Sequence, residues 1–250
     1  MREELLKLKM NGALDALEDL SKRRMDNLSF GKSLLEAEIF FRDERTGRRK
    51  ISAAKFSYER EWQQINGKKN PKIPFGEIQK LSSGNFLNTR KNICFIGKTG
   101  LGKTHSLISI GRDLCRKNKD VLFFTAASLV TKLEESKSEN KLSRLMERLK
   151  KVDLLIIDEL GFVPFSDTGA RLLFDVFTTR YQVGPIAIST NLSFEKWTQV
   201  FGSVELTAAL IDRFTHNCEI YMFEGDSMRL REAKERTSGK KTIDLETDKC

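Results

Sequence analysis

Short apolar runs alternate with longer amphipathic stretches from about residue 92 onward. The runs lie at 93–96, 121–124, 154–157, 186–188 and 220–223. Continuous apolar runs of this length are typical of parallel strands buried on both faces, and the intervening stretches are long enough for crossover helices. The pattern therefore predicts an α/β domain built on a parallel sheet.

The N-terminal part of the chain follows a helical period instead. Apolar side chains recur every three or four residues in two groups: Leu6, Met10, Leu14, Leu17 and Leu20, and then Phe30, Leu34, Ala37 and Phe41. Ser29 is the candidate N-cap of the second helix. Helix breakers mixed with charge over 66–74 indicate a linker. We therefore expect a helical domain over 1–70, the α/β domain over 71–236 and a flexible polar tail over 237–250.

Composition excludes several classes of protein. The chain has 250 residues, 39% of them hydrophobic, which is enough for one sizeable core and a small appendage. It has no apolar stretch of membrane-spanning length and no secretory signal at its N-terminus, so we expect a cytoplasmic protein without a membrane partner. Its four cysteines form no Cys-x-x-Cys pair, and there are only two histidines. Neither a disulfide framework nor a zinc site is indicated.

The charge balance is basic. The formal net charge is +9 and the pI is about 9.4, which suits a polyanionic partner but also a solvated basic face without one. Residues 42–72 hold ten Lys or Arg against four acids, a net charge of +6. The sequence leaves open whether this segment contacts DNA, a protein partner or a second copy of the chain.

A phosphate-binding motif follows the first apolar run. It fits G-x-x-x-x-G-K-[ST] without a mismatch and consists of Gly97, Lys98, Thr99, Gly100, Leu101, Gly102, Lys103 and Thr104. The glycines let backbone N–H groups curl around phosphate, Lys103 can reach the β- and γ-phosphates, and Thr104 can ligate Mg²⁺. The strand–loop–helix context that this motif requires is also predicted. The sequence thus predicts an ATP site with Mg²⁺ as cofactor.

Polar residues follow two later runs at the same edge of the predicted sheet. Asp158 and Glu159 end the third run, where Asp158 is the expected Mg²⁺ partner and Glu159 the base that activates water. An acidic turn is the alternative interpretation. Asn191 follows the fourth run and can bind the attacking water or the γ-phosphate, or else serve as a turn or N-cap residue. Arg213 and Arg229 flank the last run, and arginine suits phosphate charge in a transition state.

Taken together, these motifs resemble the IstB-like helper ATPases of insertion sequences, which are AAA+ proteins close to the DnaC-type helicase loaders. The matching segments follow the family's order and spacing: 102–105, 154–161, 173–177 with Arg180 and Tyr181, 189–192, 209–213 and 225–230. Residues 1–40 are similar less specifically. The resemblance implies a P-loop AAA+ fold with three layers around a parallel sheet, a shortened C-terminal lid and a small helical N-terminal domain.

The resemblance also implies roles for individual residues. Residues 97–105, with His105 at the end, would bind nucleotide, and Asp158 and Glu159 would be the Walker B pair. Asn191 would be sensor 1. Arg213 would be an arginine finger that reaches a neighbouring subunit's nucleotide, and Arg229 would be sensor 2. Arg180 and Arg231 compete for these two roles.

The implied function is that of an ATP-hydrolysing transposition helper. Such a protein would form an ATP-dependent homo-oligomer on duplex DNA, recruit or stimulate the transposase of its element, and disassemble on hydrolysis. The region 128–151 would face the DNA, with a solvated ion-paired helix as the alternative. Three other functions stay open: a helicase loader acting on single-stranded DNA and a helicase, a non-hydrolysing nucleotide switch, and a small-molecule kinase. The carboxylate of Glu159 disfavours the last two.

Overall fold

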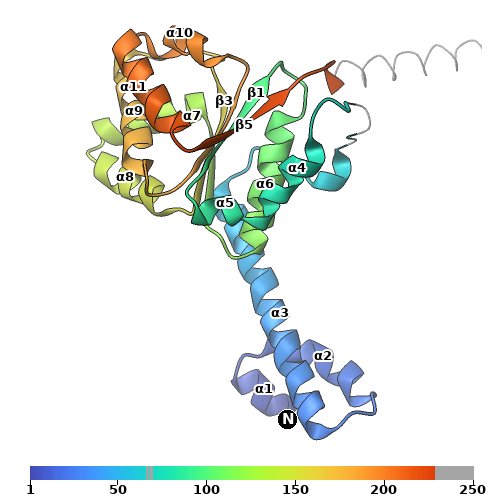
Figure 1. Ribbon diagram of the computed structural model, residues 1–250. Coiled ribbons are helices and arrows are strands. Elements are labelled where there is room, and N and C mark those ends of the chain that lie inside the picture. The colour runs from blue at the N-terminus through green and yellow to red at the C-terminus, as the bar shows by residue number, and fades with distance from the viewer. Residues whose placement is uncertain (66, 68–69, 229–250) are drawn as a thin grey trace, which may run out of the picture.

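The computed structural model describes residues 1–65, 67 and 70–228 (Figure 1). Its centre is a parallel five-stranded sheet in the order β2-β3-β4-β1-β5. The strands are β1 (Asn92–Gly97), β2 (Val121–Thr125), β3 (Leu154–Leu160), β4 (Ile186–Thr190) and β5 (Cys218–Phe223). Each of the five apolar runs thus lies within a strand, and the prediction of a parallel α/β sheet is confirmed.

Helices cover both faces of the sheet (Figure 1). One face carries α4 (Phe75–Lys80), α5 (Asn85–Asn88) and α6 (Lys103–Arg116), with the short η3 (Leu81–Ser83) between the first two. The other face carries α7 (Ala126–Ser138), α8 (Leu142–Lys151), α9 (Asp167–Arg180), η4 (Phe194–Lys196), α10 (Thr198–Phe201) and α11 (Val204–Thr215). A separate apolar core fills each interface, so the domain has the three predicted layers.

The N-terminal helices form a third, small core. They are α1 (Arg2–Lys7), α2 (Asn11–Ser21) and α3 (Asn27–Ala54). Glu38 of α3 is buried and accepts a hydrogen bond from the backbone N–H of Gly12 at 2.8 Å. The expectation that Ser29 caps the second helix is wrong. Asp26 is the cap, because its Oδ1 accepts from the N–H groups of Leu28 and Ser29.

Helix α3 continues from the N-terminal unit to the sheet domain as one long rod (Figure 1). Its C-terminal half packs on α6, where a Cβ on Gly47 would lie 3.1 Å from the Cα of Arg116. Lys50 also forms an ion pair with Asp120 at 3.0 Å, at the turn before β2. The basic segment that starts at Arg42 is therefore helical up to residue 54.

The segment after α3 lies along α6 and includes η1 (Trp62–Gln64). The carboxylate of Glu61 pairs with Arg112 at 2.8 Å and with Arg116 at 2.5 Å. The indole N–H of Trp62 donates to Asp113 at 2.9 Å. These contacts fasten the N-terminal segment to the helix that follows the phosphate-binding motif.

In the part of the chain that the structure describes, no helix combines the length and the apolar character needed to cross a bilayer. The expected lid from residue 229 on and the tail over 237–250 lie outside the described residues.

Candidate nucleotide-binding site

The phosphate-binding motif forms the loop between β1 and α6. Gly100 and Gly102 adopt left-handed φ angles of 82° and 94°, which glycine adopts without steric cost. A Cβ on Gly97 would lie 2.2 Å from the carbonyl oxygen of Phe223 on β5, so the loop also needs glycine for close backbone approach. Lys98 and Thr99 are exposed on the loop, whereas Leu101 is buried in the core below it.

Lys103 is folded into the loop. Its side chain is buried, and its Nζ donates to the carbonyl oxygens of Gly97 at 2.5 Å and Lys98 at 2.8 Å. A buried ammonium needs acceptors of this kind to offset its desolvation. Phosphate oxygens can replace the two carbonyl acceptors, so the Lys103 ammonium already lies where a bound triphosphate would contact it.

Thr104 and Asp158 meet at the carboxyl end of the sheet. The hydroxyl of Thr104 donates to Oδ1 of Asp158 at 3.1 Å. Burial raises the pKa of the Asp158 carboxyl, while the hydroxyls of Ser189 and Thr104 act in the opposite direction. A hydroxyl beside a carboxylate suits Mg²⁺, which takes few protein ligands and completes its shell with phosphates and water. Among the described residues, no three or more His, Cys, Asp or Glu side chains are grouped so that they could hold a metal ion.

Glu159 stands in an unusual backbone conformation at the end of β3. Its φ is 60°, and the pairing of β3 with β4 is irregular between Ile157 and Leu160. A non-glycine residue in this region is strained by about 1–2 kcal/mol, and such strain is often kept at functional sites. The irregularity turns Glu159 outward, and its side chain is exposed while that of Asp158 is buried.

Ser189 links the two acidic residues, a role that the sequence did not reveal. Its hydroxyl donates to Oδ1 of Asp158 and accepts from the backbone N–H of Glu159 at 3.1 Å. Ser189 is the residue of β4 that pairs with Phe95 of β1, so it lies beside the strand that leads into the phosphate loop. A serine at the tip of the strand next to an acidic pair is the signal that would have identified it.

Asn191 lies beside the same turn. It follows β4 directly, is exposed, and its Oδ1 lies 3.2 Å from where a Cβ on Gly161 would stand. The backbone around it is held by Thr190, whose hydroxyl accepts from the N–H of Leu192 at 3.0 Å. Asn191, Glu159 and Asp158 thus share the end of the sheet where the phosphate loop begins.

Two segments outside the phosphate motif flank the phosphate loop, and of these the sequence assigned only 225–230, through Arg229, to the site. Phe75 approaches from the N-terminal side, and its Cζ lies 3.6 Å from where a Cβ on Gly102 would stand. Met228 approaches from the C-terminal side, and its backbone N–H donates to the carbonyl of Gly100 at 2.9 Å. The side chain of Asn70 joins the two segments by donating to the carbonyl oxygen of Asp226 at 3.2 Å.

His105 turns away from the loop. Its Nε2–H donates to the backbone carbonyl of Glu61 at 2.8 Å, which fixes the tautomer with the proton on Nε2. Burial lowers the pKa of the imidazole. The side chain of His105 therefore contacts the segment after α3.

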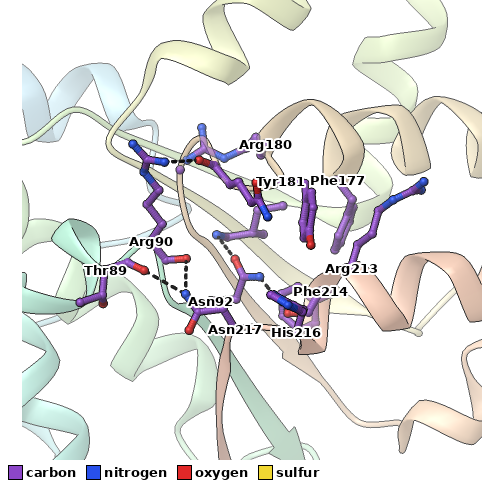
Figure 2. Close-up of a pocket in the computed structure, with 13 residues that line it drawn as sticks. Thr89, Arg90, Asn92, Phe177, Arg180, Tyr181, Arg213, Phe214, His216 and Asn217 are labelled. Carbon is purple, nitrogen blue, oxygen red and sulfur yellow. Dashed lines mark hydrogen bonds between the residues drawn. The ribbon is translucent and has the colours of Figure 1, made fainter.

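Arg180 and Arg213 lie at the other end of the sheet. Arg213 is near the end of α11, before β5, whose first residue Cys218 pairs with Asn92 at the start of β1. Figure 2 shows Arg213 and Arg180 on the rim of a cavity of about 430 Å³, with the Arg213 guanidinium pointing away from Arg90 and Asn217. Strands of six residues span about 20 Å, so Arg213 lies far from its own phosphate loop.

Arg180 is a buried structural residue. It is 1% exposed, and its guanidinium donates to the carbonyl oxygens of Leu149, of Val152 at 3.2 Å and of Pro185 at 2.9 Å. These contacts tie the end of α9 to the end of α8 and the start of β4. A guanidinium held in this way has no free face for a nucleotide. Arg229 and Arg231 lie outside the described residues.

The strand order, the phosphate loop after β1 and the acidic pair at the end of β3 define the class: a P-loop nucleotide-binding protein with the AAA+ fold. The chain belongs to a particular family within it, since the model of the IstB-like ATP-binding proteins matches residues 3–236.

Comparison with individual proteins agrees with this assignment. The chain is 33% identical over 211 residues to the ATP-binding protein named for insertion sequence IS5376 of Geobacillus stearothermophilus, covering 83% of this chain and 84% of the relative. It is 31% identical over 229 residues to that of IS232 of Bacillus thuringiensis, covering 90% and 92%. The solved DnaC helicase loader matches with a TM-score of 0.54 at 19% identity, covering 70% of this chain and 99% of the loader, which shows the shared fold.

Proposed function

We propose that this protein is a Mg²⁺-dependent ATPase that assists DNA transposition. It would oligomerise on duplex DNA with little sequence preference in the cytoplasm, recruit or stimulate the transposase of its element, and disassemble when ATP is hydrolysed. The observation that carries the hydrolytic part is the hydrogen-bonded set at the end of the sheet, in which Ser189 orients Asp158 and Glu159. The link to transposition is supported by relatives named for insertion sequences.

In hydrolysis, Lys103 would leave the carbonyls of Gly97 and Lys98 and bind the β- and γ-phosphates. Thr104 and Asp158 would hold Mg²⁺, which supplies charge neutralisation at the phosphates when bound. The exposed carboxylate of Glu159 would accept a proton from the attacking water, and Asn191 would orient that water. A nucleotide switch that only senses ATP needs no such carboxylate beside the phosphate loop.

Arg213 would complete the site of a neighbouring subunit. Its position at the amino end of the sheet argues against a role in its own subunit's site. An arginine supplied in trans makes turnover depend on assembly, because a lone subunit lacks one stabilising charge of the transition state. ATP would favour the oligomer for the same reason, since it is bound by both partners.

Helix α8 offers the DNA-contacting surface that we propose. Four exposed cations recur at helical spacing on α8 or directly before it: Lys141, Arg144, Arg148 and Lys151. Of these four cations, Lys141 forms an ion pair with Glu139 at 2.8 Å, and the other three form none with the described residues. The alternative of an ion-paired solvated helix predicts more pairs along α8. Unpaired cations spaced along one helix suit contacts to a phosphate backbone without base readout.

A helicase loader is the second candidate, favoured by the similarity in fold to the solved loader over nearly all of that structure. The preferred DNA separates the two functions. ATP turnover should be measured for the purified protein alone, with duplex DNA and with single-stranded DNA, together with the size of each mixture formed with an unhydrolysable ATP analogue. Stimulation by duplex and large ATP-dependent assemblies are expected. Stimulation by single strands alone would favour the loader, and indifference to both DNAs would contradict both functions.

A further inference from the structure

Helix α11 presents Arg213 on a support built by α9. The guanidinium carbon of Arg213 lies 4.9 Å from the centre of the Phe174 ring, and Nη1 donates to the hydroxyl of Thr178 at 3.3 Å. Phe174 and Thr178 are four residues apart on α9, so they lie on one face of that helix, beside α11. Two independent contacts therefore act on the same guanidinium.

The two contacts differ in kind, and together they fix the direction of the side chain. An aromatic ring holds a guanidinium over its face by cation–π attraction, and a hydroxyl accepts from one specific N–H. An arginine side chain without such contacts loses considerable rotamer entropy when it is ordered. A surface arginine supported in this way is already oriented when it contacts the phosphate of a neighbouring subunit. This matters because catalysis is sensitive to small misplacements.

We infer that Phe174 and Thr178 are positioning residues, which hold Arg213 in the orientation in which it reaches the nucleotide of a neighbouring subunit. The inference rests on the proposed role of Arg213. Neither residue would touch nucleotide itself. Phe174 is half-buried and packs against the core on that face of the sheet, so leucine is the replacement that keeps an apolar contact there, and Thr178 is exposed.

The test compares Phe174→Leu/Thr178→Val with Arg213→Ala in the full-length protein. Thr179→Val is the matched control, because Thr179 is the next residue of α9 and no contact joins it to Arg213 in the described structure. Turnover at saturating ATP should fall about tenfold in the double variant, as expected for losing one cation–π contact and one hydrogen bond. The KM for ATP and the midpoint of thermal unfolding should stay unchanged, since the residues of each subunit that bind its own ATP are not altered.

Mixing distinguishes positioning from damage to the fold. Glu159→Gln keeps an intact Arg213, so adding it to the double variant should raise turnover above the sum of the two proteins alone. If the double variant keeps full activity while Arg213→Ala is inactive, this inference is wrong and the proposed arginine finger is supported. An active Arg213→Ala would refute the finger assignment itself. Loss of activity in the double variant without rescue by mixing would also overturn the inference, as would an equal loss in Thr179→Val.

Discussion

The hydroxyl of Ser189 donates a hydrogen bond to Oδ1 of Asp158, and the same oxygen of Asp158 accepts from Thr104. One buried carboxylate oxygen is thus shared by a residue of the phosphate loop's helix and a residue of β4. Because Ser189 also accepts from the N–H of Glu159, its hydroxyl sets the geometry of the acidic pair.

Replacing Ser189 by alanine should lower turnover more than nucleotide binding. A hydrogen bond to a charged group contributes about 1.5–3 kcal/mol, so turnover at saturating ATP should drop by about tenfold or more, while the Kd for ATP changes little. Ser109→Ala is the matched control, because Ser109 is an equally buried serine whose hydroxyl has no partner in the described structure. Equal turnover in both variants would contradict the orienting role.

Glu159→Gln should bind ATP and stay assembled on duplex DNA without turning over. Glutamine keeps the size of the side chain and cannot accept the proton from water at neutral pH. Steady-state ATPase assays measure the loss of turnover, and sizing of the protein on duplex DNA measures whether the assembly persists. Glu205→Gln, an exposed glutamate at the start of α11, serves as the control and should behave as the parent protein. Normal turnover in Glu159→Gln would sink the assignment of the base.

Arg180 and Arg213 should give opposite results when replaced. Arg180→Met removes the partner of several buried carbonyl groups, and each unsatisfied group costs about 1–3 kcal/mol, so the free energy of unfolding should fall by roughly 3 kcal/mol. Arg213→Ala lies at a half-exposed position and should leave unfolding nearly unchanged while abolishing turnover. Denaturant unfolding and ATPase measured on both variants decide the matter, and a stable but inactive Arg180→Met would return Arg180 to the candidates for the finger.

The junction between Glu61 and α6 should respond to acid. Hydrogen bonds from Arg116 lower the pKa of the Glu61 carboxyl below its ordinary value of 4.5, although burial acts against them. A group with a lowered folded-state pKa contributes stability above its unfolded pKa, and that contribution is lost as pH falls through the folded value. Glu61→Gln should therefore unfold more easily at pH 7, and its deficit should shrink below about pH 4. A deficit independent of pH would point to packing alone.

Charge reversal on α8 tests the proposed DNA surface. Arg144→Glu/Arg148→Glu should weaken binding to duplexes of any sequence by a similar factor, because phosphate contacts carry no sequence information. The slope of log K against log salt should become shallower by about 0.9 for each lost phosphate contact. Arg171→Glu/Lys196→Glu has the same change of charge on α9 and η4 and should keep the parent's slope. An unchanged slope in the α8 variant would place the DNA elsewhere.

The parts of this molecule that depend on local sequence pattern could be predicted from the sequence. The apolar runs located the strands because a strand buried on both faces is apolar at consecutive positions. The phosphate motif located the loop because the backbone geometry of the loop requires its glycines. Asp158, Glu159 and Asn191 were expected together because parallel strands end at one edge of the sheet.

What the sequence could not provide depends on contacts between distant segments. Phe75 and Met228 flank the phosphate loop although more than 150 residues separate them, and Phe75 belongs to no motif that would place it there. Arg180 resembles any other arginine at a helix end until its acceptor carbonyls are known. Glu61 lies in the basic segment 42–72, whose contact partner the sequence leaves open, and only its pairing with Arg112 and Arg116 shows that it is fixed to α6.

Helix α9 follows the acidic pair in the chain and supports Arg213 through Phe174 and Thr178. It begins just after the turn that follows Glu159, with Ser166 as its N-cap, and Arg180 anchors its far end to three backbone carbonyls. Between those ends it supports Arg213. In the proposed oligomer, α9 would therefore connect each subunit's acidic pair with the arginine that this subunit offers to the next one. Because such a contact joins different faces of neighbouring subunits, the row of subunits would have a direction.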